Sequence, residues 1–353
     1  MPKKTLFEIK DVDRAFYAEK LQSFLPDRMI DVHTHLWRTA HSARISANAA
    51  SRVVSWPGRV AKENPAEHLI ETYSLLFPDK QVTPLVFASL PAQNLNAINS
   101  YVRSAARSCG FPSLLFSDPR WSGAELERRI GSGGFLGIKS YLTMAPQYIP
   151  GKEIRILDFF PPHQLEILNA HRWILMLHIP RDGRLKDPVN LGQMLEIEER
   201  YPRVQVVIAH VGRAYCAGDV GNAFEVLART KRMSFDFSAN TNAQVFEQLI
   251  ETVGPKRILF GSDLPITRMR MRRIERDGRY VNLVPKGMYG DVSADPNMGE
   301  LSGRDAEALT FFLYEEIDAF RIAAGKTGLS RRDVANVFCD NARRMIEAAM
   351  PMG

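Results

Sequence analysis

The sequence predicts an α/β protein folded as a (β/α)8 TIM barrel, and three observations support this prediction. Eight short apolar runs recur along the 353 residues, and segments with helical periodicity separate several of them. The first run is not followed by the Gly-x-Gly-x-x-Gly turn of an open nucleotide-binding sheet. Strands that alternate with helices are parallel and joined by crossovers, and a closed barrel with insertions fits a chain of this length.

The predicted strands are rich in Val, Ile, Leu and Phe, as strands buried on both faces are. They cover residues 29–35, 82–90, 113–118, 135–142, 173–179, 204–211, 233–239 and 257–263. Three of the segments between them carry clear helix signals. Residues 161–171 follow a Pro-Pro entry, 187–202 run from Asp-Pro to Pro202, and 243–255 end at Gly254 and Pro255.

The remaining segments add loops and helices to this barrel. We expect one domain over residues 1–353, with residues 1–27 as an amino-terminal helical extension. There are long loop insertions after strands one and eight: 36–81, which can hold extra helices, and 264–304, a barrel-mouth loop with little periodicity. A long amphipathic helix over 303–325 and extra carboxyl-terminal helices, which begin at the capping box of Ser330 and Asp333, close the chain.

Composition restricts the classes of function. Hydrophobic residues make up 45% of the chain, but no window approaches the roughly 20 apolar residues that span a bilayer. The first residues lack a secretory signal and the three cysteines are far apart, so we expect a cytoplasmic protein without disulfides. Lysine plus arginine exceed aspartate plus glutamate only by 46 to 40, and no zinc-finger or RNP pattern occurs, which argues against nucleic-acid binding.

The first predicted strand, 28-RMIDVHTHLW-37, suggests a metal site. Residues two apart on a strand point the same way, so His33 and His35 project together with Cα atoms about 6.5–7 Å apart. Asp31 would share their face one layer down and could orient an imidazole. The same spacing also occurs in ordinary hydrogen-bonded histidines, so the other strands have to decide between the two interpretations.

Ionisable residues also close four later strands. Lys139, His178, His210 and Asp263 lie at or near the ends of strands four, five, six and eight. Each of them alone would be a core residue or a helix cap, but a barrel brings all these strand ends to one mouth, where the chemistry takes place. Alternation places His178, His210 and Asp263 on the barrel interior, with Gly261 making room beneath the site.

Together these residues resemble a known family. The Asp31-Val-His-Thr-His motif, the histidines that close strands five and six, and Phe260-Gly-Ser-Asp263-Leu-Pro on strand eight are similar to those of the amidohydrolase superfamily. The most similar branch is the amidohydrolase-related (amidohydrolase 2) group of metal-dependent TIM-barrel hydrolases and decarboxylases, whose closing helix the stretch from Asn341 to Arg343 resembles. The resemblance runs from about residue 28 to residue 348.

The resemblance implies a ligand set and a mechanism. One divalent ion, Zn²⁺ or alternatively Mn²⁺, would be held by His33, His35, His178 and Asp263. The ion would lower the pKa of a bound water to about 7 and polarise the substrate's carbonyl. Asp263 would accept the proton and pass it to the leaving group, and His210 would polarise the carbonyl or the developing oxyanion.

Three functions remain open at this point. The first is hydrolysis of an amide, ester or lactone of a small molecule, and the second is non-oxidative decarboxylation of an aromatic or unsaturated acid at the same site. The third is a binding protein without activity, which we would expect to have lost a ligand position, and none is lost. Cations that follow strand ends suit an anionic substrate in either enzyme: Arg38, Arg120, Arg181 and Arg213.

Two further features have alternative interpretations. A lysine at the position of Lys139 is carbamylated and bridges two metals in binuclear relatives; we expect one metal here, with the amine paired to a carboxylate or to the substrate. The arginine-rich segment 268–279 could fold over the mouth and bind an acidic or phosphorylated substrate, or it could be a solvated arm or a subunit contact. The family analogy also implies a homo-oligomer.

Overall fold

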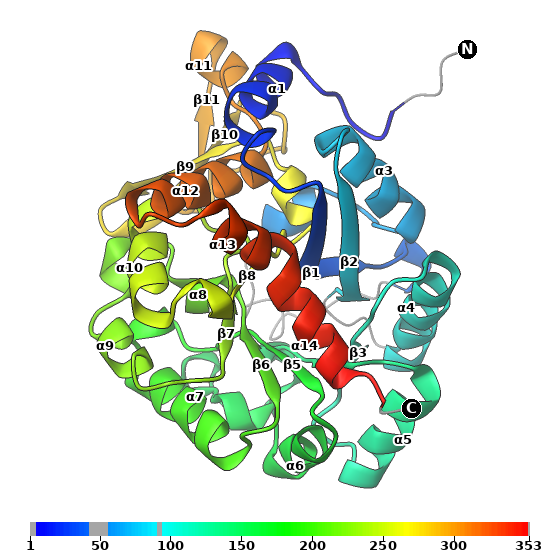
Figure 1. Cartoon of the computed structure of the whole chain (residues 1–353). Helices are drawn as coiled ribbons and strands as arrows, with labels where there is room; N and C mark the ends of the chain where they lie inside the picture. Colours follow the sequence, from blue (N-terminus) through cyan, green and yellow to red (C-terminus); the bar gives the residue numbers. More distant parts are fainter. Residues whose placement is uncertain (1–4, 42–55, 90–93, 352–353) are drawn as a thin grey trace.

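The centre of the molecule is a ring of eight parallel strands, each of which overlaps one of the predicted apolar runs (Figure 1). The computed structural model describes residues 5–41, 56–89 and 94–351. Hydrogen-bonded neighbours run from β1 to β2 and from β3 through β8. The isolated parallel bridges Val86–Ser113 and Thr34–Leu264 close the ring on either side. The strands are β1 (Arg28–Leu36), β2 (Gln81–Ala88), β3 (Leu115–Phe116), β4 (Gly137–Lys139), β5 (Ile174–Leu177), β6 (Gln205–Ile208), β7 (Ser234–Asp236) and β8 (Ile258–Leu259).

Helices surround the ring, as the crossover connections require. The three predicted helices are present with the expected end signals. Asp187 caps α7 through its side chain, α6 begins at Pro162, and Gly254 follows the last residue of α10. The helices between the strands are α3 (Ala66–Leu76), α4 (Leu95–Cys109), α5 (Gly123–Gly133), α6 (Pro162–His171), α7 (Pro188–Arg200), α8 (His210–Arg213), α9 (Ala223–Leu227) and α10 (Ala243–Val253).

An inner apolar cluster fills the barrel, with Val32, Phe87, Met176 and Leu259 among its members. The helix α14 (Asn341–Ala349) crosses the barrel in Figure 1, and its Met345 packs into the same cluster. Its contacts with the beginning of β8 place α14 at the amino-terminal end of the strands. Since this end is covered, the opposite end, where the strands finish, is the one that can hold a site.

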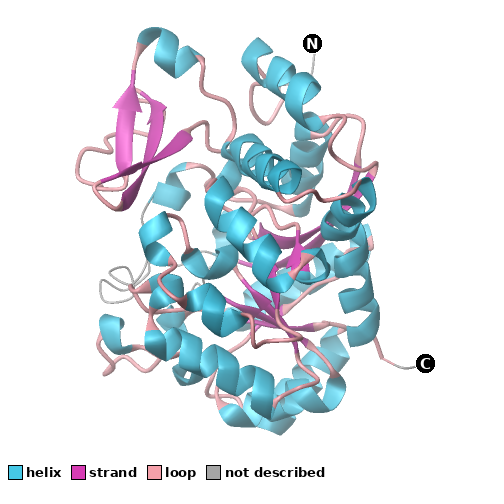
Figure 2. Ribbon diagram, turned by 60° about the vertical axis from the view of Figure 1, so that its left-hand side comes forward, coloured by secondary structure: helices cyan, strands magenta, loops and turns pink. Residues whose placement is uncertain are grey.

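Residues 264–304 contain regular structure where the sequence predicts a loop with little periodicity. β9 (Arg272–Arg276) pairs antiparallel with β10 (Arg279–Pro285), and β10 pairs parallel with β11 (Met298–Leu301). Figure 2 shows this three-stranded sheet apart from the strands of the barrel. The signal for the hairpin is Asp277-Gly278, since both residues adopt the positive φ that a tight two-residue turn needs.

The prediction of one long helix over residues 303–325 is wrong. The structure has two helices, α11 (Gly303–Glu307) and α12 (Phe312–Lys326). They are separate because the backbone between them pairs with residues 269–271: Met271 donates to the carbonyl of Thr310, and Phe312 donates to that of Met269. The predicted capping box of Ser330 is present at the start of α13 (Arg331–Ala335), and a π-helical turn, Asn336–Asp340, leads into α14.

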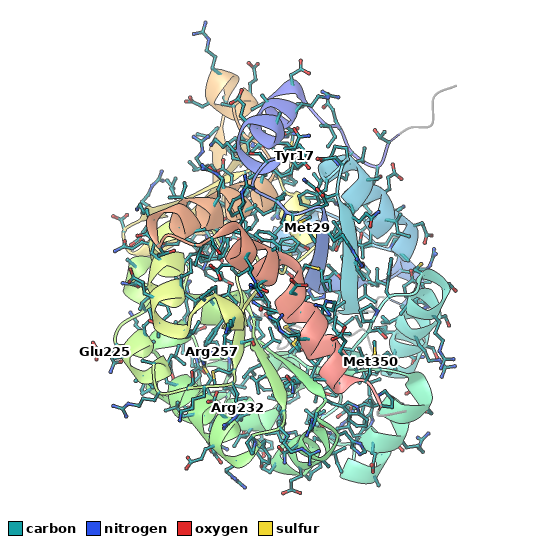
Figure 3. All side chains as sticks on the ribbon, viewed as in Figure 1. Tyr17, Met29, Glu225, Arg232, Arg257 and Met350 are labelled. Atoms are coloured by element: carbon teal, nitrogen blue, oxygen red, sulfur yellow. The ribbon has the colours of Figure 1, made fainter. Side chains whose placement is uncertain are left out.

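The amino-terminal segment forms α1 (Asp11–Phe16) and a π-helical turn, Tyr17–Leu21. The ring of Tyr17, labelled in Figure 3, lies 5.9 Å from that of Tyr314 on α12. Between β1 and α3 the described residues include two short 3-10 helices, Thr39–His41 and Trp56–Arg59; the rest of the helices expected there falls on 42–55, outside the described residues. Within the described ranges, no helix has the length and apolar character needed to cross a membrane.

Candidate metal centre

The strand β1 carries His33 and His35 into the barrel with the help of a bulge. Its register against β2 shifts after Asp31, where β1 holds one residue more than β2. Bulges of this kind re-aim side chains beside a site. The sequence predicts that Asp31 could orient an imidazole, but in the structure its carboxylate has other partners. Its carboxylate accepts hydrogen bonds from the hydroxyl of Tyr73 on α3 at 2.7 Å and from the backbone N–H groups of His33 and Ser262, which fastens β1 to α3 and to the segment after β8.

Asp263 follows β8 and reaches both histidines of β1. Its Oδ1 lies 3.0 Å from Nε2 of His35 and 3.6 Å from Nε2 of His33. The candidate ligand atoms of these three residues all lie within 4.8 Å of one another. Gly261 makes this approach possible, as expected, because a Cβ at that position would stand 2.8 Å from the Cβ of His33.

Asp236, at the end of β7, fixes the orientation of the neighbouring histidines. Its Oδ2 accepts from Nδ1 of His33 at 2.9 Å, and its Oδ1 accepts from the backbone N–H of His210 at 2.9 Å and from the hydroxyl of Ser238. Burial alone would raise the pKa of Asp236, but its contact with His33 lowers it, so the carboxylate stays ionised. A carboxylate in this position sets the tautomer and direction of a ligand histidine.

Asp236 belongs to none of the motifs that predict the site from the sequence. The signal that could have found it is its place in the predicted strand 233–239, at the same level of the barrel as the other strand-end residues. Asp236, His33 and His210 also have ligand atoms within 4.8 Å of one another. Hydrogen bonds already connect Asp236 to both histidines, so we interpret this second group as the support of the first.

The donor set around Asp263 fits a divalent cation. Nδ1 of His33 is bonded to Asp236, and Nδ1 of His35 lies 3.3 Å from the carbonyl oxygen of Ala88, so each neutral ring has its lone pair on Nε2. Both lone pairs face the carboxylate of Asp263, which is unfavourable unless a proton or a cation lies between them. Burial lowers the pKa of His33 and disfavours the proton. Two imidazoles and a carboxylate are typical ligands of Zn²⁺.

Simple alternation does not explain the direction of His210. Val206 and Ile208 belong to the outer apolar cluster, whereas Val207 and Ala209 belong to the inner one. The alternation that predicts an interior His210 would also turn Val206 and Ile208 inwards, so the face that it predicts for this strand is wrong. His210 still reaches the barrel interior, because its φ of 56° is left-handed and turns the chain sharply after β6.

The ring of His210 lies beside that of His33, with centroids 4.8 Å apart. Its Nδ1 lies 3.0 Å from the carbonyl oxygen of Ser238, which can only accept. Burial lowers the pKa of His210 to about 4. The ring is therefore neutral near pH 7, with its proton on Nδ1 and a lone pair on Nε2.

His178 follows β5 and lies on the far side of His210. Its ring centroid is 5.3 Å from that of His210 and 4.7 Å from that of Tyr141, and it is outside the three-residue group around Asp263. The buried Nδ1 of His178 has no hydrogen-bond partner among the described residues, which is unusual for a polar atom in a protein interior. Burial, and then the charge of Arg213, lower the pKa of His178, so its ring is neutral and able to coordinate.

Lys139 ends β4 and is 3% exposed. Burial lowers the pKa of its amine to about 8, although the negative charges of Asp236 and Asp263 oppose that shift. The amine thus lies in the field of both carboxylates of the site. Its Nζ is 5.5 Å from the ring of Phe87, which also contacts His33 and His35.

Three of the four predicted strand-end arginines pair with acids near them. Arg38 pairs with Glu67 and Arg120 with Asp118, both at 2.6 Å, and Arg181 pairs with Asp187 at 3.2 Å. Arg213 differs, because its Nη1 donates to the carbonyl oxygens of residues 179–181. Its positive charge helps to lower the pKa of His178 and opposes the rise that burial causes in the pKa of Tyr141. Arg213 is therefore the member of this set that lies beside the site.

Most of the arginine-rich segment has structural partners. Arg270 is buried against Asp13 at 2.6 Å, Arg272 lies 3.5 Å from Glu315, and Arg268 donates to the hydroxyl of Thr72. Arg273 instead donates to the carbonyl of Ala239, which follows β7. The hypothesis of a substrate-binding segment therefore applies to Arg273 rather than to these neighbours.

Known proteins resemble this chain in sequence and in fold. A family model described as amidohydrolase matches residues 30–347, and no curated protein matches the chain. An amidohydrolase 2 from Bifidobacterium longum subsp. infantis shares 16% identity over 91% of this chain and 99% of its own, with a TM-score of 0.53. A probable 2-pyrone-4,6-dicarboxylic acid hydrolase from Acinetobacter baumannii, solved with citric acid bound, shares 14% over 90% and 99%, with a TM-score of 0.55. A dihydroxybenzoic acid decarboxylase from Polaromonas sp. JS666, solved with manganese and 2-nitroresorcinol, shares 14% over 92% and 98%, with a TM-score of 0.50.

Proposed function

The chain belongs to the amidohydrolase family, and on this premise we propose that it hydrolyses an amide, ester or lactone of a small molecule with the help of one divalent ion. The observation that carries the proposal is the position of Asp263, whose Oδ1 faces the Nε2 lone pairs of His33 and His35. We propose that these residues and His178, with its unsatisfied Nδ1, hold the ion. Bound there, a divalent ion supplies Lewis acidity and lowers the pKa of water to about 7.

Asp263 is the proposed proton acceptor. Burial alone would raise its pKa, but its contact with the imidazole of His35 and the other neighbouring imidazoles lower it to about 2, so it is ionised near neutral pH. We propose that it takes the proton of the attacking water and returns it to the leaving group. His210, neutral and with its lone pair on Nε2, would accept a hydrogen bond from that water; it can polarise a carbonyl, as the resemblance implies, only after it gains a proton.

Zn²⁺ is the proposed ion because two or three imidazoles and one carboxylate suit it, and Mn²⁺ is the alternative, being the ion in the Polaromonas decarboxylase. We propose that Lys139 remains an amine and that Arg213 contacts the substrate, whereas Arg181 is held by Asp187. A cytoplasmic location is supported by three free cysteines. A homo-oligomer is proposed from family membership alone.

Decarboxylation of an aromatic or unsaturated acid is the second candidate. The observation that favours it is Arg213, which lies beside the site without a carboxylate partner among the described residues. A guanidinium in that state can hold the carboxylate of an acid that reacts. Release of CO2 from aromatic acids, tested beside hydrolysis of lactones, amides and esters with the same preparation, separates the two reactions.

Metal content tests the proposal first. We expect about one Zn²⁺ or Mn²⁺ per chain in protein purified without added metal and measured by plasma emission, and a loss of that ion in His178→Ala. His171→Ala is the control, because His171 is bonded to Glu127 in the outer helices. Two ions per chain would instead make Lys139 a bridging ligand. A protein that holds no metal, even after reconstitution, contradicts the proposal.

A further inference from the structure

Two guanidinium groups near the candidate metal centre have no acidic partner among the described residues. Arg213 donates only to backbone carbonyls, and Arg273 on β9 is bonded only to neutral oxygen atoms. Their neighbour Arg184 is different, because it pairs with Asp219 at 2.6 Å. The structure thus neutralises one of three adjacent cations and leaves two uncompensated.

Arg273 is held in a fixed position rather than extended into solvent. Its Nε donates to Oδ1 of Asn282 at 2.9 Å and its Nη1 to the carbonyl of Ala239 at 2.6 Å. Its guanidinium carbon lies 4.4 Å from the ring centre of Tyr280 and 4.9 Å from that of Tyr215. These contacts use Nε and one hydrogen of Nη1, so the second hydrogen of Nη1 and both hydrogens of Nη2 are left to bind another group.

Two routes connect Arg273 to the candidate metal centre. The residue before Ala239, Ser238, accepts the hydrogen bond of His210. On the other side, burial raises the pKa of the Tyr215 hydroxyl, and the positive charges of Arg213 and Arg273 both oppose that shift. Burial, and to a lesser degree Tyr280, raise the pKa of Tyr141, and the ring of Tyr141 lies 4.7 Å from that of His178. Tyr215 and Tyr280, whose ring centres lie 5.1 Å apart, therefore border Arg273, and Tyr141 borders His178.

Removing a cation from water without a counter-charge is unfavourable, and two such cations near one hydroxyl also repel each other. Aromatic rings and carbonyls offset part of this cost for Arg273, but a carboxylate offers the fork-shaped guanidinium two parallel charge-assisted hydrogen bonds. An anionic group between the two arginines would compensate both charges. The neighbouring tyrosines would border a planar substrate there.

We propose, on the premise that the proposed function is correct, that the β9–β10 hairpin completes the substrate site and that Arg273, together with Arg213, binds a carboxylate carried by the substrate away from the carbonyl that reacts. The substrate is then an amide, ester or lactone that also carries a carboxylate, and this carboxylate lies away from the bond that reacts. Arg273 is a specificity-determining residue in this arrangement, since it recognises a group that does not react.

The test uses two probes that differ by one charge: benzene-1,3-dicarboxylate and its monomethyl ester. Calorimetry at constant salt measures the affinity of the metal-loaded full chain for each. We expect the wild-type protein to prefer the diacid by about tenfold or more, and Arg273→Gln to bring the ratio of affinities close to one. Arg276→Gln, an exposed arginine at the end of the same strand, should leave the ratio unchanged.

Arg273→Lys keeps the charge but cannot form two parallel hydrogen bonds, so its ratio should lie between those of the wild type and Arg273→Gln. This variant carries the test if Arg273→Gln does not fold. A wild type without preference for the diacid, or a preference that survives both substitutions, overturns the inference. The metal content of each variant and the affinity for the monoester report on the metal site itself, so failure of the proposed function is recognised separately.

Discussion

Three histidines of the candidate metal centre, His33, His35 and His210, are each fixed through one ring nitrogen, and the acceptor differs among them. His33 uses the carboxylate of Asp236, whereas His35 and His210 use the backbone carbonyls of Ala88 and Ser238. A carboxylate makes the opposite nitrogen a stronger donor to a metal than a carbonyl does. His33 should therefore be the strongest imidazole ligand of the set, and Asp236 the supporting residue whose loss most weakens metal binding.

The buried amine of Lys139 predicts that metal affinity depends on pH. Burial lowers the pKa of its amine to about 8, so the group is a cation below that pH and neutral above it. The cation repels a divalent ion in the same pocket. We expect the Kd for Zn²⁺ to fall several-fold between about pH 7 and about pH 9, and this change to shrink in Lys139→Met.

Competition with a zinc-buffering chelator at each pH gives the two curves. Proton loss from other ligands affects the wild type and the variant alike, so the difference between the curves isolates the amine. Identical slopes would show that Lys139 does not act on the ion. A variant that binds one ion fewer than the wild type would mean that the amine is itself a ligand.

At the scale of elements, hydrophobic runs and their terminal polar residues predict much of the fold and part of the site. The eight strands and the positions of His33, His35 and Asp263 at one mouth follow from local patterns, because parallel strands in a barrel all finish at the same end. Each of these predictions depends on a two-residue period or on a position at the end of a strand, and both patterns are visible in the sequence.

The features that local patterns miss depend on contacts between distant segments. The bulge in β1 directs Asp31 towards α3, and the left-handed turn at His210 reverses the face that alternation predicts after β6. The break between α11 and α12 exists because residues 310–312 pair with residues 269–271. Propensity favours a continuous helix there, and tertiary hydrogen bonds override it.

The closing helix α14 stabilises the barrel from the end opposite to the site. The side-chain amide of Asn341 donates to the carbonyls of Pro255 and Ile258, at 2.8 and 2.9 Å, where β8 begins. Asn341→Ala leaves these carbonyls without their donor, and we expect the free energy of unfolding to fall by about 1–3 kcal/mol. Denaturant unfolding measures this loss, and metal affinity should stay within twofold because the site lies at the other end of the strands.

Arg343→Ala is the matched control on the same helix, because its pairs with Asp340 and Glu347 are exposed to solvent, so their removal should lower the free energy of unfolding much less. Equal losses in the two variants would mean that the buried amide adds nothing specific to the closure of the barrel.

At the scale of the whole molecule, three distant segments meet at one buried ion pair. Arg270, in the segment that follows β8, places Nη1 and Nη2 at 2.8 and 2.6 Å from the two carboxylate oxygens of Asp13 on α1. The hydroxyl of Thr310 donates to the same carboxylate, and the carbonyl of Leu309 accepts from Arg270. The amino-terminal extension is thereby joined to the segment that carries β9 and Arg273.

This arrangement predicts that the amino-terminal extension is required for stability. Asp13→Ala leaves the buried charge of Arg270 unpaired, and we expect the free energy of unfolding to fall by about 3–5 kcal/mol. Replacing both partners, in Asp13→Ala with Arg270→Met, removes the unpaired charge and should recover part of the loss, which denaturant unfolding of the two single variants and the double variant measures. A loss below about 1 kcal/mol in Asp13→Ala would show that the extension packs on the barrel without this pair. Because Arg270 lies two residues before the start of β9, we expect Asp13→Ala to displace Arg273 as well and so to lower the affinity for benzene-1,3-dicarboxylate more than that for its monomethyl ester.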